Sequence, residues 1–250
     1  MYDLKKVQVS VTDMCNRKCS FCPHVDNLIF PNKKVWMSVD TAQRLATDLS
    51  ENNFDGIVSI SGYGEPLLHP KIFDIVKEFT SRNIKTRMMT NGDLLVKKKV
   101  SVEELDSLGL FEIKINIYDD YNQFVKYGGF FYKRIKKTPF RLAKNFDSMS
   151  GQQAFGINYT NRAGTLKETK TDFDPVCYEP TRHIMIDWNG DVLICCNDWI
   201  RKEVYGNLNE SSFYEIWNNS EKLNDHRKLL LEGKRCDIIT CQNCDFNSRR

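Results

Sequence analysis

Three cysteines stand close together near the start of the chain, in the stretch TDMCNRKCSFCPH at 12–24. Three residues separate Cys15 from Cys19, and two separate Cys19 from Cys22. Such thiols could form a disulfide, hold a zinc ion, or ligate an iron–sulfur cluster. Structural zinc and a [4Fe–4S] cluster both take four ligands. Three thiolates on one loop would therefore leave one iron open to a substrate or cofactor. A zinc loop that borrows a distant ligand is the alternative.

Six more cysteines lie toward the other end of the chain, at Cys177, Cys195, Cys196, Cys236, Cys241 and Cys244. The total of nine is odd, so complete disulfide pairing is impossible. The chain begins without an apolar leader and holds no apolar run of the roughly 18 residues that a membrane span needs. We therefore expect a cytoplasmic protein, where cysteines serve metals or catalysis more often than disulfides. Two separate metal sites are implied.

Composition narrows the function classes. The chain has 250 residues, of which 41% are hydrophobic, so a real core is expected and wholesale disorder is excluded. A formal net charge of +3 with 28% charged residues gives no argument for nucleic acid or an anionic membrane. The length suits one large domain, with or without a small appendage.

The elements that must position the first cysteines alternate between strands and helices. Residues 5–12 alternate valine with polar residues, so they predict a strand that runs straight into the cysteine loop. Ser38 or Asp40 can cap a helix at 38–52. The further predicted strands are 56–62, 85–92 and 112–119, and the further predicted helices are 69–83 and 101–110. This order predicts an α/β fold with a parallel sheet or barrel.

The later half is less regular. Residues 127–137 are basic and aromatic without a clear period, 139–147 could form a strand, and 152–164 resemble a strand ending in a loop. Residues 184–196 predict a β-hairpin that turns at Asn189 and Gly190, and 211–233 predict one helix. We place domains at 1–165 and 166–250. The lysine runs at 97–99 and 133–137 are interpreted as solvated faces.

The stretch CNRKCSFC resembles the signature of the radical S-adenosylmethionine (SAM) superfamily, with Phe21 in its aromatic position before the last cysteine. The resemblance implies a partial (β/α)6 TIM-like barrel. It also implies that Cys15, Cys19 and Cys22 hold a [4Fe–4S] cluster whose open iron binds S-adenosylmethionine. An electron from that cluster then releases a 5′-deoxyadenosyl radical, which abstracts hydrogen from the substrate.

Other stretches carry the same resemblance at the carboxyl ends of the predicted strands, where barrel active sites gather. SGYGEP at 61–66 resembles a Gly-Gly-Glu-Pro element, whose glycines would let backbone approach the ligand. An ordinary strand-to-helix turn is the alternative there. In NRAG at 161–164, Arg162 could pair with a carboxylate, although a lone arginine usually lies on the surface. The resemblance assigns cofactor binding to Phe21, Gly62, Gly64, Glu65, Asn91, Asn116 and Arg162.

The second cysteine group resembles the auxiliary-cluster extension called SPASM, in its shortened "twitch" form, built from the hairpin and the following helix. Two auxiliary clusters would need about eight thiolates, so six imply one [4Fe–4S] cluster. The resemblance implies Cys177, Cys195, Cys241 and Cys244 as ligands, which leaves Cys196 and Cys236 spare. A structural zinc site with four cysteines is the alternative.

Within the superfamily, the pattern is most similar to the 2-deoxy-scyllo-inosamine dehydrogenases. That similarity implies oxidation of a hydroxyl to a ketone, with the auxiliary cluster as electron acceptor and Tyr63, Arg162 and Asn197 facing a small-molecule substrate. Those enzymes carry a carboxylate where this chain has Asn197. Flavodoxin or ferredoxin is the implied electron donor, with no nucleic-acid or membrane partner. A peptide- or protein-modifying maturase, an epimerase and a non-catalytic zinc-binding module are the alternatives.

Overall fold

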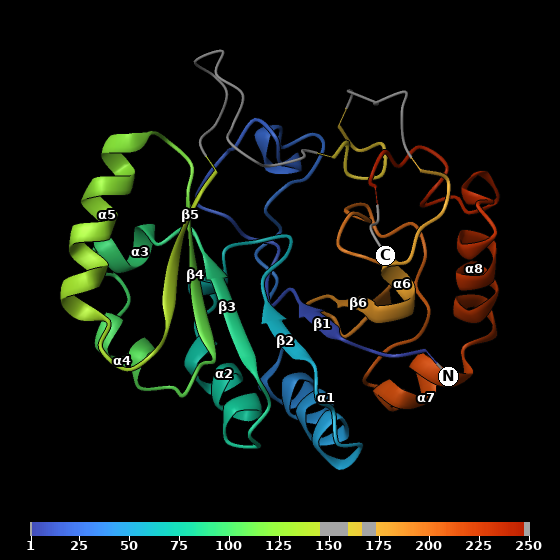
Figure 1. Ribbon diagram of the computed structural model, residues 1–250, viewed down its shortest axis with the longest axis horizontal. Helices are drawn as coiled ribbons and strands as arrows, with labels where there is room; N and C mark the ends of the chain where they lie inside the picture. Colours follow the sequence, from blue (N-terminus) through green and yellow to red (C-terminus); the bar gives the residue numbers. More distant parts are fainter. Residues whose placement is uncertain (1, 146–159, 167–173, 248–250) are drawn as a thin grey trace.

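The computed structural model describes residues 2–145, 160–166 and 174–247 (Figure 1). In these residues one sheet runs through the molecule in the order β5-β4-β3-β2-β1-β6-β7. Its strands are β1 Lys6–Val9, β2 Ile57–Ile60, β3 Thr86–Thr90, β4 Glu112–Ile117, β5 Phe140–Lys144, β6 His183–Ile186 and β7 Val192–Leu193. Every neighbouring pair is parallel except β6 and β7, which form an antiparallel hairpin. The expected mostly parallel α/β fold is confirmed.

The sixth parallel strand of this sheet comes from the C-terminal part of the chain. β6 pairs with β1 in the register Val7 to Ile184 and Val9 to Ile186. Residues 152–159 of the expected strand 152–164 lie outside the described residues. The hairpin expected at 184–196 is confirmed, with Gly190 at a φ of 84° in its turn. The sheet is therefore shared between the N-terminal and C-terminal segments.

Helices lie between the parallel strands and in the C-terminal segment of the chain. They are α1 Val39–Glu51, α2 Ile72–Thr80, α3 Asp93–Val96, α4 Val102–Asp106, α5 Tyr121–Arg134, α6 Glu179–Arg182, α7 Phe213–Asn219 and α8 Glu221–Leu231. Short 3₁₀ turns are η1 Pro23–Val25, η2 Pro66–Leu68 and η4 Arg235–Asp237. Ser38 caps α1 by accepting a hydrogen bond from the backbone of Thr41, as the sequence predicts. None of the helices in the described residues is both long and apolar enough to cross a bilayer.

Side chains alternate across the sheet because successive residues of a strand point to opposite faces. Val7, Val58 and Ile113 are fully buried in the core, whereas Lys6 and Lys114, one position away, line a cavity. The sheet thus presents an apolar face to the core and a polar face to the cavity.

Two expectations about helices need correction. The expected single helix at 211–233 is wrong, because the chain breaks at Ser220 into α7 and α8. Ser220 has an extended backbone, and its side chain accepts from Leu223 to cap α8. Residues 127–134 of the region without a clear period in the sequence belong to α5, which ends at Arg134. That helix begins at Tyr121, and the carboxylate of Asp120 caps it by accepting a hydrogen bond from the backbone of Gln123.

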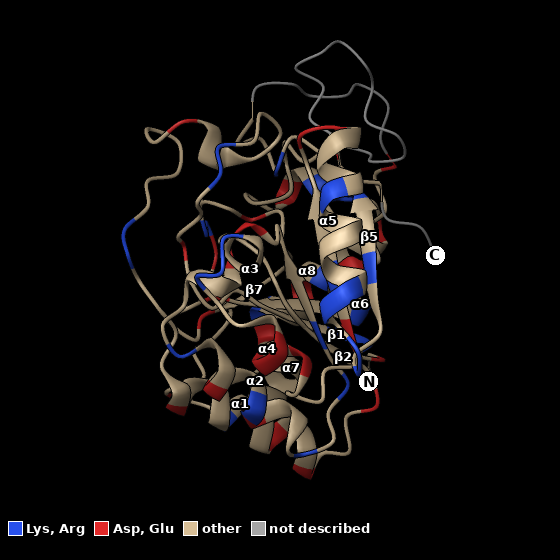
Figure 2. Cartoon of the chain, turned by 90° about the vertical axis from the view of Figure 1, so that its left-hand side faces the viewer, with Lys and Arg blue, Asp and Glu red and all other residues tan. Residues whose placement is uncertain are grey.

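The lysine runs lie on exposed surface. Lys97, Lys98 and Lys99 are exposed beyond α3, and Lys133, Lys136 and Lys137 are exposed at the end of α5. Figure 2 shows Lys and Arg along α5 and the neighbouring β5 on the side that faces the viewer. Their exposure agrees with solvated faces.

Candidate active site

A cavity of about 440 Å³ opens on the polar face of the sheet, and the first cysteine cluster lies at its wall. The cavity extends from the carboxyl ends of the strands toward their amino ends. The sequence-predicted residues that line it are Cys15, Phe21, Cys19, Cys22, Gly62, Tyr63, Gly64, Glu65, Asn91, Asn116 and Arg162. The fold therefore gathers eleven positions from five separate segments into one site.

The cysteine loop is anchored by an arginine that the sequence reading missed. Arg17 donates to Asp93 from Nε at 2.9 Å and from Nη2 at 2.8 Å. It also reaches Asp119 from Nη1 at 2.6 Å. Tyr127 donates its hydroxyl to Asp93 at 2.6 Å. These bonds hold the loop to the residues that follow β3 and β4. The short spacing of the cysteine motif could not predict these bonds, because the two acidic partners of Arg17 are about 76 to 102 residues away in the sequence.

Glu65 ties the loop after β2 to the end of β3. Its Oε1 accepts hydrogen bonds from Thr90 Oγ1 at 2.6 Å and from the backbone of Leu67 at 3.1 Å. Its Oε2 accepts from the backbone of Asn91 at 2.8 Å. Burial raises the pKa of Glu65 to about 7, although these three donors act in the opposite direction. The carboxylate is thus largely committed to holding the site together.

Gly64 allows the loop after β2 to pass directly under the cysteine loop. A Cβ at Gly64 would lie 2.4 Å from the carbonyl oxygen of Met14 and 2.6 Å from that of Thr12. Gly62 has a φ of 145°, which L side chains rarely adopt. The structure therefore explains both glycines by packing and backbone conformation within the chain, and their approach to a bound cofactor stays a prediction.

The three thiols share a partly buried environment. Burial raises the pKa of Cys15 to about 12, and the charges of Cys22 and Cys19 raise it further. Tyr118, which the sequence reading missed, follows β4, and its ring packs tilted against that of Phe21 with 5.6 Å between the ring centroids. Burial raises the pKa of Tyr118, and the charges of Cys19 and the other two thiols contribute. The thiols therefore face one common space, and metal ligation would have to displace their protons.

Arg162 offers an unused donor inside the cavity. It has a φ of 53°, an uncommon value for a residue with a side chain. Its Nη1 donates to Asn197 Oδ1 at 3.3 Å, while its buried Nε has no hydrogen-bond partner among the described residues. Asn197 also accepts from Thr160 Oγ1 at 3.0 Å, and it lines a second, smaller cavity instead of the large one.

Aromatic side chains close one wall of the large cavity. Tyr63 is buried, and its hydroxyl donates to the backbone oxygen of Asp198 at 2.7 Å. Burial raises the pKa of Tyr63. Nε2 of His24 lies 2.6 Å from the carbonyl oxygen of Tyr63. This nitrogen must carry the hydrogen, because a carbonyl oxygen only accepts. Burial lowers the pKa of His24, so it stands as a neutral imidazole beside Trp199.

Four cysteines of the second group meet at the smaller cavity, namely Cys177, Cys195, Cys241 and Cys244. Buried Arg235 lies beside them and donates to the carbonyl oxygens of Pro175, Val176, Cys244 and Phe246 at 2.8 to 3.2 Å. Burial raises the pKa of Cys244, and the Arg235 charge lowers it. Cys236, which the sequence left spare, is exposed outside this cavity.

Cys195 and Cys196 separate the two cavities. Cys195 lines the smaller cavity with the three other thiols, and Cys196 lines the large cavity with the first cysteine cluster. Because the two residues are consecutive, one peptide unit joins the walls of both sites. Cys196 thus lies at the wall of the large cavity, a position that its spacing in the sequence did not predict.

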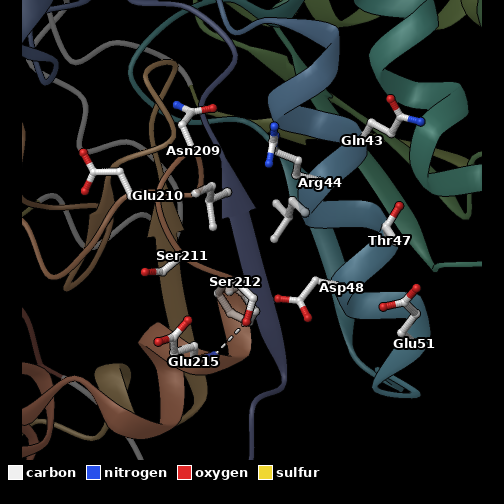
Figure 3. Close-up of a pocket in the computed structure, with 13 residues that line it drawn as sticks. Gln43, Arg44, Thr47, Asp48, Glu51, Asn209, Glu210, Ser211, Ser212 and Glu215 are labelled. Atoms are coloured by element: carbon white, nitrogen blue, oxygen red, sulfur yellow. Dashed lines mark hydrogen bonds between the residues drawn. The ribbon is translucent and has the colours of Figure 1, made fainter.

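The donor sets fit the two iron–sulfur clusters in the number and type of their ligands. Three thiols and an arginine with a buried free N–H line the large cavity, and a complete set of four thiols lines the smaller one. In the described part of the chain, no group of three or more His, Cys, Asp or Glu side chains is arranged so that it could hold a metal ion. A further pocket of about 480 Å³, between α1 and the chain leading into α7, is lined by Arg44, Asp48, Glu51 and Glu215 among others, and by no cysteine (Figure 3).

Comparison with known families agrees with this site. The radical SAM superfamily matches residues 9–164, and an iron–sulfur cluster-binding domain, SPASM, matches residues 177–245. The chain therefore belongs to the radical SAM superfamily. It is an enzyme of this class that uses S-adenosylmethionine, a [4Fe–4S] cluster that binds it, and an auxiliary iron–sulfur cluster.

A particular relative resembles it over nearly its whole length. The S-adenosyl-L-methionine-dependent 2-deoxy-scyllo-inosamine dehydrogenase of Niallia circulans is 29% identical, covering 96% of this chain and 92% of that protein. The crystal structure of BtrN in complex with AdoMet and 2-DOIA superposes with a TM-score of 0.78 at 26% identity, covering 98% of this chain and 95% of that one. SuiB of Streptococcus suis, bound to its precursor peptide SuiA, gives a TM-score of 0.54 at 16% identity, covering 91% of this chain and 67% of that one, and shares the fold alone.

Proposed function

We propose that this enzyme oxidises a hydroxyl of a small polar substrate, such as a sugar or aminocyclitol, to a ketone. The substrate carbon that bears the hydroxyl loses a hydrogen atom, and the hydroxyl loses a proton while one electron leaves. Bound S-adenosylmethionine and the first cluster supply the hydrogen abstraction, and the auxiliary cluster supplies the electron acceptor. The likeness to a dehydrogenase over nearly the full length of both proteins supports this reaction.

The observation that carries the proposal is the placement of Cys195 and Cys196. One lies with the four-thiol set and the other lines the large cavity. A substrate in the large cavity would therefore be adjacent to the wall that holds the auxiliary ligands. Such an arrangement suits a reaction that must remove an electron from its substrate, because short separation favours electron transfer.

The walls of the cavity suit a small molecule. A volume of about 440 Å³ lies within the usual range of about 300–1,000 Å³ for small-ligand sites. Tyr63 and Trp199 form an apolar wall, and Arg162 presents its free Nε–H for a carboxylate of the cofactor or substrate. The hydroxyl of Tyr63 is already donated to Asp198, so we assign Tyr63 a positioning role. Asn197 acts by holding Arg162.

The test uses anaerobically reconstituted full-length protein with S-adenosylmethionine, a reductant and 2-deoxy-scyllo-inosamine or related polyols. Mass spectrometry should find 5′-deoxyadenosine together with a product that has lost two hydrogens. Deuterium at the oxidised carbon should appear in the 5′-deoxyadenosine. Formation of 5′-deoxyadenosine only with a peptide substrate, or a product with unchanged hydrogen content, would instead support the maturase or epimerase.

Electron delivery to the first cluster is assigned to flavodoxin or ferredoxin. Either reduced protein should replace the chemical reductant in the same reaction. Failure of both carriers, while dithionite still supports turnover, would contradict this assignment without affecting the oxidation itself.

A further inference from the structure

The lower part of the large cavity carries positive charge that the proposed chemistry does not use. This cavity floor is formed by Lys6, Gln8, Ser59, Arg87 and Lys114, all of which lie within strands β1 to β4. The cysteines lie at the opposite, carboxyl end of the same cavity. The floor is thus a separate part of the site, open to whatever occupies the space above it.

The two lysines of the floor lack ion-pair partners. Among the described residues, neither Lys6 nor Lys114 makes a side-chain hydrogen bond or a salt bridge. Both are half-buried. Burial lowers the pKa of Lys114, the charges of Arg141, Arg87 and Lys6 lower it further, and the charge of Glu112 raises it. Lys6 lies on β1 and Lys114 on β4, with β2 and β3 between them.

The nearby carboxylates already have other partners. Glu112 pairs with Arg87 and, at 2.6 Å, with Arg141. Glu179 lies 3.8 Å from the guanidinium of Arg182 and 2.8 Å from Nδ1 of His183, although it also feels the charge of Lys6. These bonds leave the charge of the two lysines only partly balanced.

Across the whole cavity, positively charged side chains outnumber negatively charged ones. Glu65 is the sole carboxylate among the described residues that line it, and its oxygens accept three hydrogen bonds from the chain. Arg17 is neutralised by Asp93 and Asp119. A substrate whose charged group is an amine would meet repulsion here, whereas an anionic group would find two free ammonium donors.

We infer that the cavity floor is an anion subsite, in which Lys6 and Lys114 bind a phosphate or carboxylate group of the substrate. This inference rests on the proposed oxidation of a small polar molecule and narrows its substrate to an anionic one. The anion holds one end of the molecule at the floor. The other end, which carries the hydroxyl, is then directed toward the cysteine loop.

The test measures binding alone, by calorimetric titration of reconstituted full-length protein that holds S-adenosylmethionine. The probes are glucosamine 6-phosphate, glucuronate and glucosamine. Both anions should bind at least about tenfold more tightly than glucosamine. A preference for glucosamine 6-phosphate alone identifies phosphate as the group, and a preference for glucuronate alone identifies carboxylate. Equal binding of all three, or no detectable binding of either anion, would overturn the inference.

Substitutions of the two lysines test whether the anion binds at the cavity floor. Lys6→Gln and Lys114→Gln should each weaken binding of the preferred anion about tenfold, and Lys114→Arg should retain it. The matched control is Lys85→Gln, since Lys85 is exposed and lies outside the cavity lining. Unchanged anion affinity in both glutamine variants, with unchanged thermal unfolding, would overturn the inference. Anion preference without ketone formation would contradict only the proposed oxidation.

Discussion

The guanidinium of Arg17 and the carboxylate of Asp93 form a two-bond ion pair, with 2.9 Å between Nε and Oδ2 and 2.8 Å between Nη2 and Oδ1. Arg17 belongs to the cysteine loop, and Asp93 is the first residue of α3. The planar guanidinium and carboxylate match in this geometry, so the pair fixes orientation as well as distance. The loop that presents the thiols is therefore held to the carboxyl end of the sheet by a bond between residues far apart in sequence.

Replacement of Asp93 by Asn should loosen the cysteine loop. The amide keeps the size of the side chain but loses the charge, so the partly buried Arg17 keeps only the more exposed Asp119 as an ionised partner. We expect the free energy of unfolding to fall by about 1.5–3 kcal/mol and the iron retained after gel filtration to fall with it. Chemical denaturation and iron analysis measure the two effects.

Asp119→Asn is the matched control for this change. Asp119 also pairs with Arg17, but its side chain is 57% exposed against 8% for Asp93. Solvent screens such a pair, so we expect a loss below about 1 kcal/mol. Equal losses in the two variants would show that the buried ion pair is not what holds the loop.

The stability of the cluster-free protein should depend on the protonation of Glu65. Its pKa rises from 4.5 in an exposed carboxyl to about 7 in the folded chain, chiefly through burial. Between these values the folded state holds a proton that the unfolded state releases, so stability falls as the pH rises from about 4.5 to 7. Above that window the contribution is constant. Denaturation midpoints at stepped pH values measure the slope.

Glu65→Gln should flatten this part of the pH profile. The amide cannot ionise, although its NH₂ group would face the backbone donor of Asn91 and lower stability at every pH. Equal slopes of stability against pH in the wild-type protein and the variant, between pH 5 and 7, would contradict the assignment of the slope to Glu65.

Substitution of Gly64 by Ala should displace the two loops that cross beneath the cysteines. The added methyl group would lie within 2.6 Å of two backbone oxygens, which cannot move aside like the end of a side chain. We expect a loss of about 1–3 kcal/mol. Gly129→Ala in α5 is the control, because its Cβ would meet nothing within 4 Å and alanine favours a helix. Similar stability of the two variants would refute the packing argument.

Cysteine substitutions should separate ligands from spare thiols in the C-terminal segment. Cys241→Ser should reduce the iron content after reconstitution from about eight to about four per chain, because it removes one ligand of the auxiliary cluster. Cys236→Ser and Cys196→Ser should leave it near eight, since these residues lie outside the four-thiol cavity. Loss of about four irons in either control would show that the ligand set has been assigned wrongly.

Local patterns predicted much of the architecture because they depend on near neighbours. The alternation of valines at 7, 9 and 11 marks the first strand, and Ser38 caps α1 as expected. The Asn189–Gly190 turn predicts its hairpin. The break at Ser220 was missed because the residues on both sides favour a helix. Its signal was a serine placed to cap the second segment.

Site residues were predictable where a motif fixes their spacing, and not where the fold alone brings them together. Nine of the eleven predicted positions that line the large cavity follow the ends of β1, β2 and β3, which parallel topology collects at one edge. Asn197 joins the smaller cavity because the chain turns between Cys196 and Asp198. Tyr118 and His24 gave no pattern, since a single aromatic residue is common in any core.

The sequence by itself determined the chemistry of this protein, because the three N-terminal cysteines act through a spacing that one loop keeps in any fold. It also determined the order of strands and helices. Only the tertiary structure decided that Arg17 is held by Asp93, that Cys195 and Cys196 line different cavities, and that Lys6 and Lys114 share a floor. Those relations depend on the pairing of distant strands, and burial then sets the charge that each group can carry.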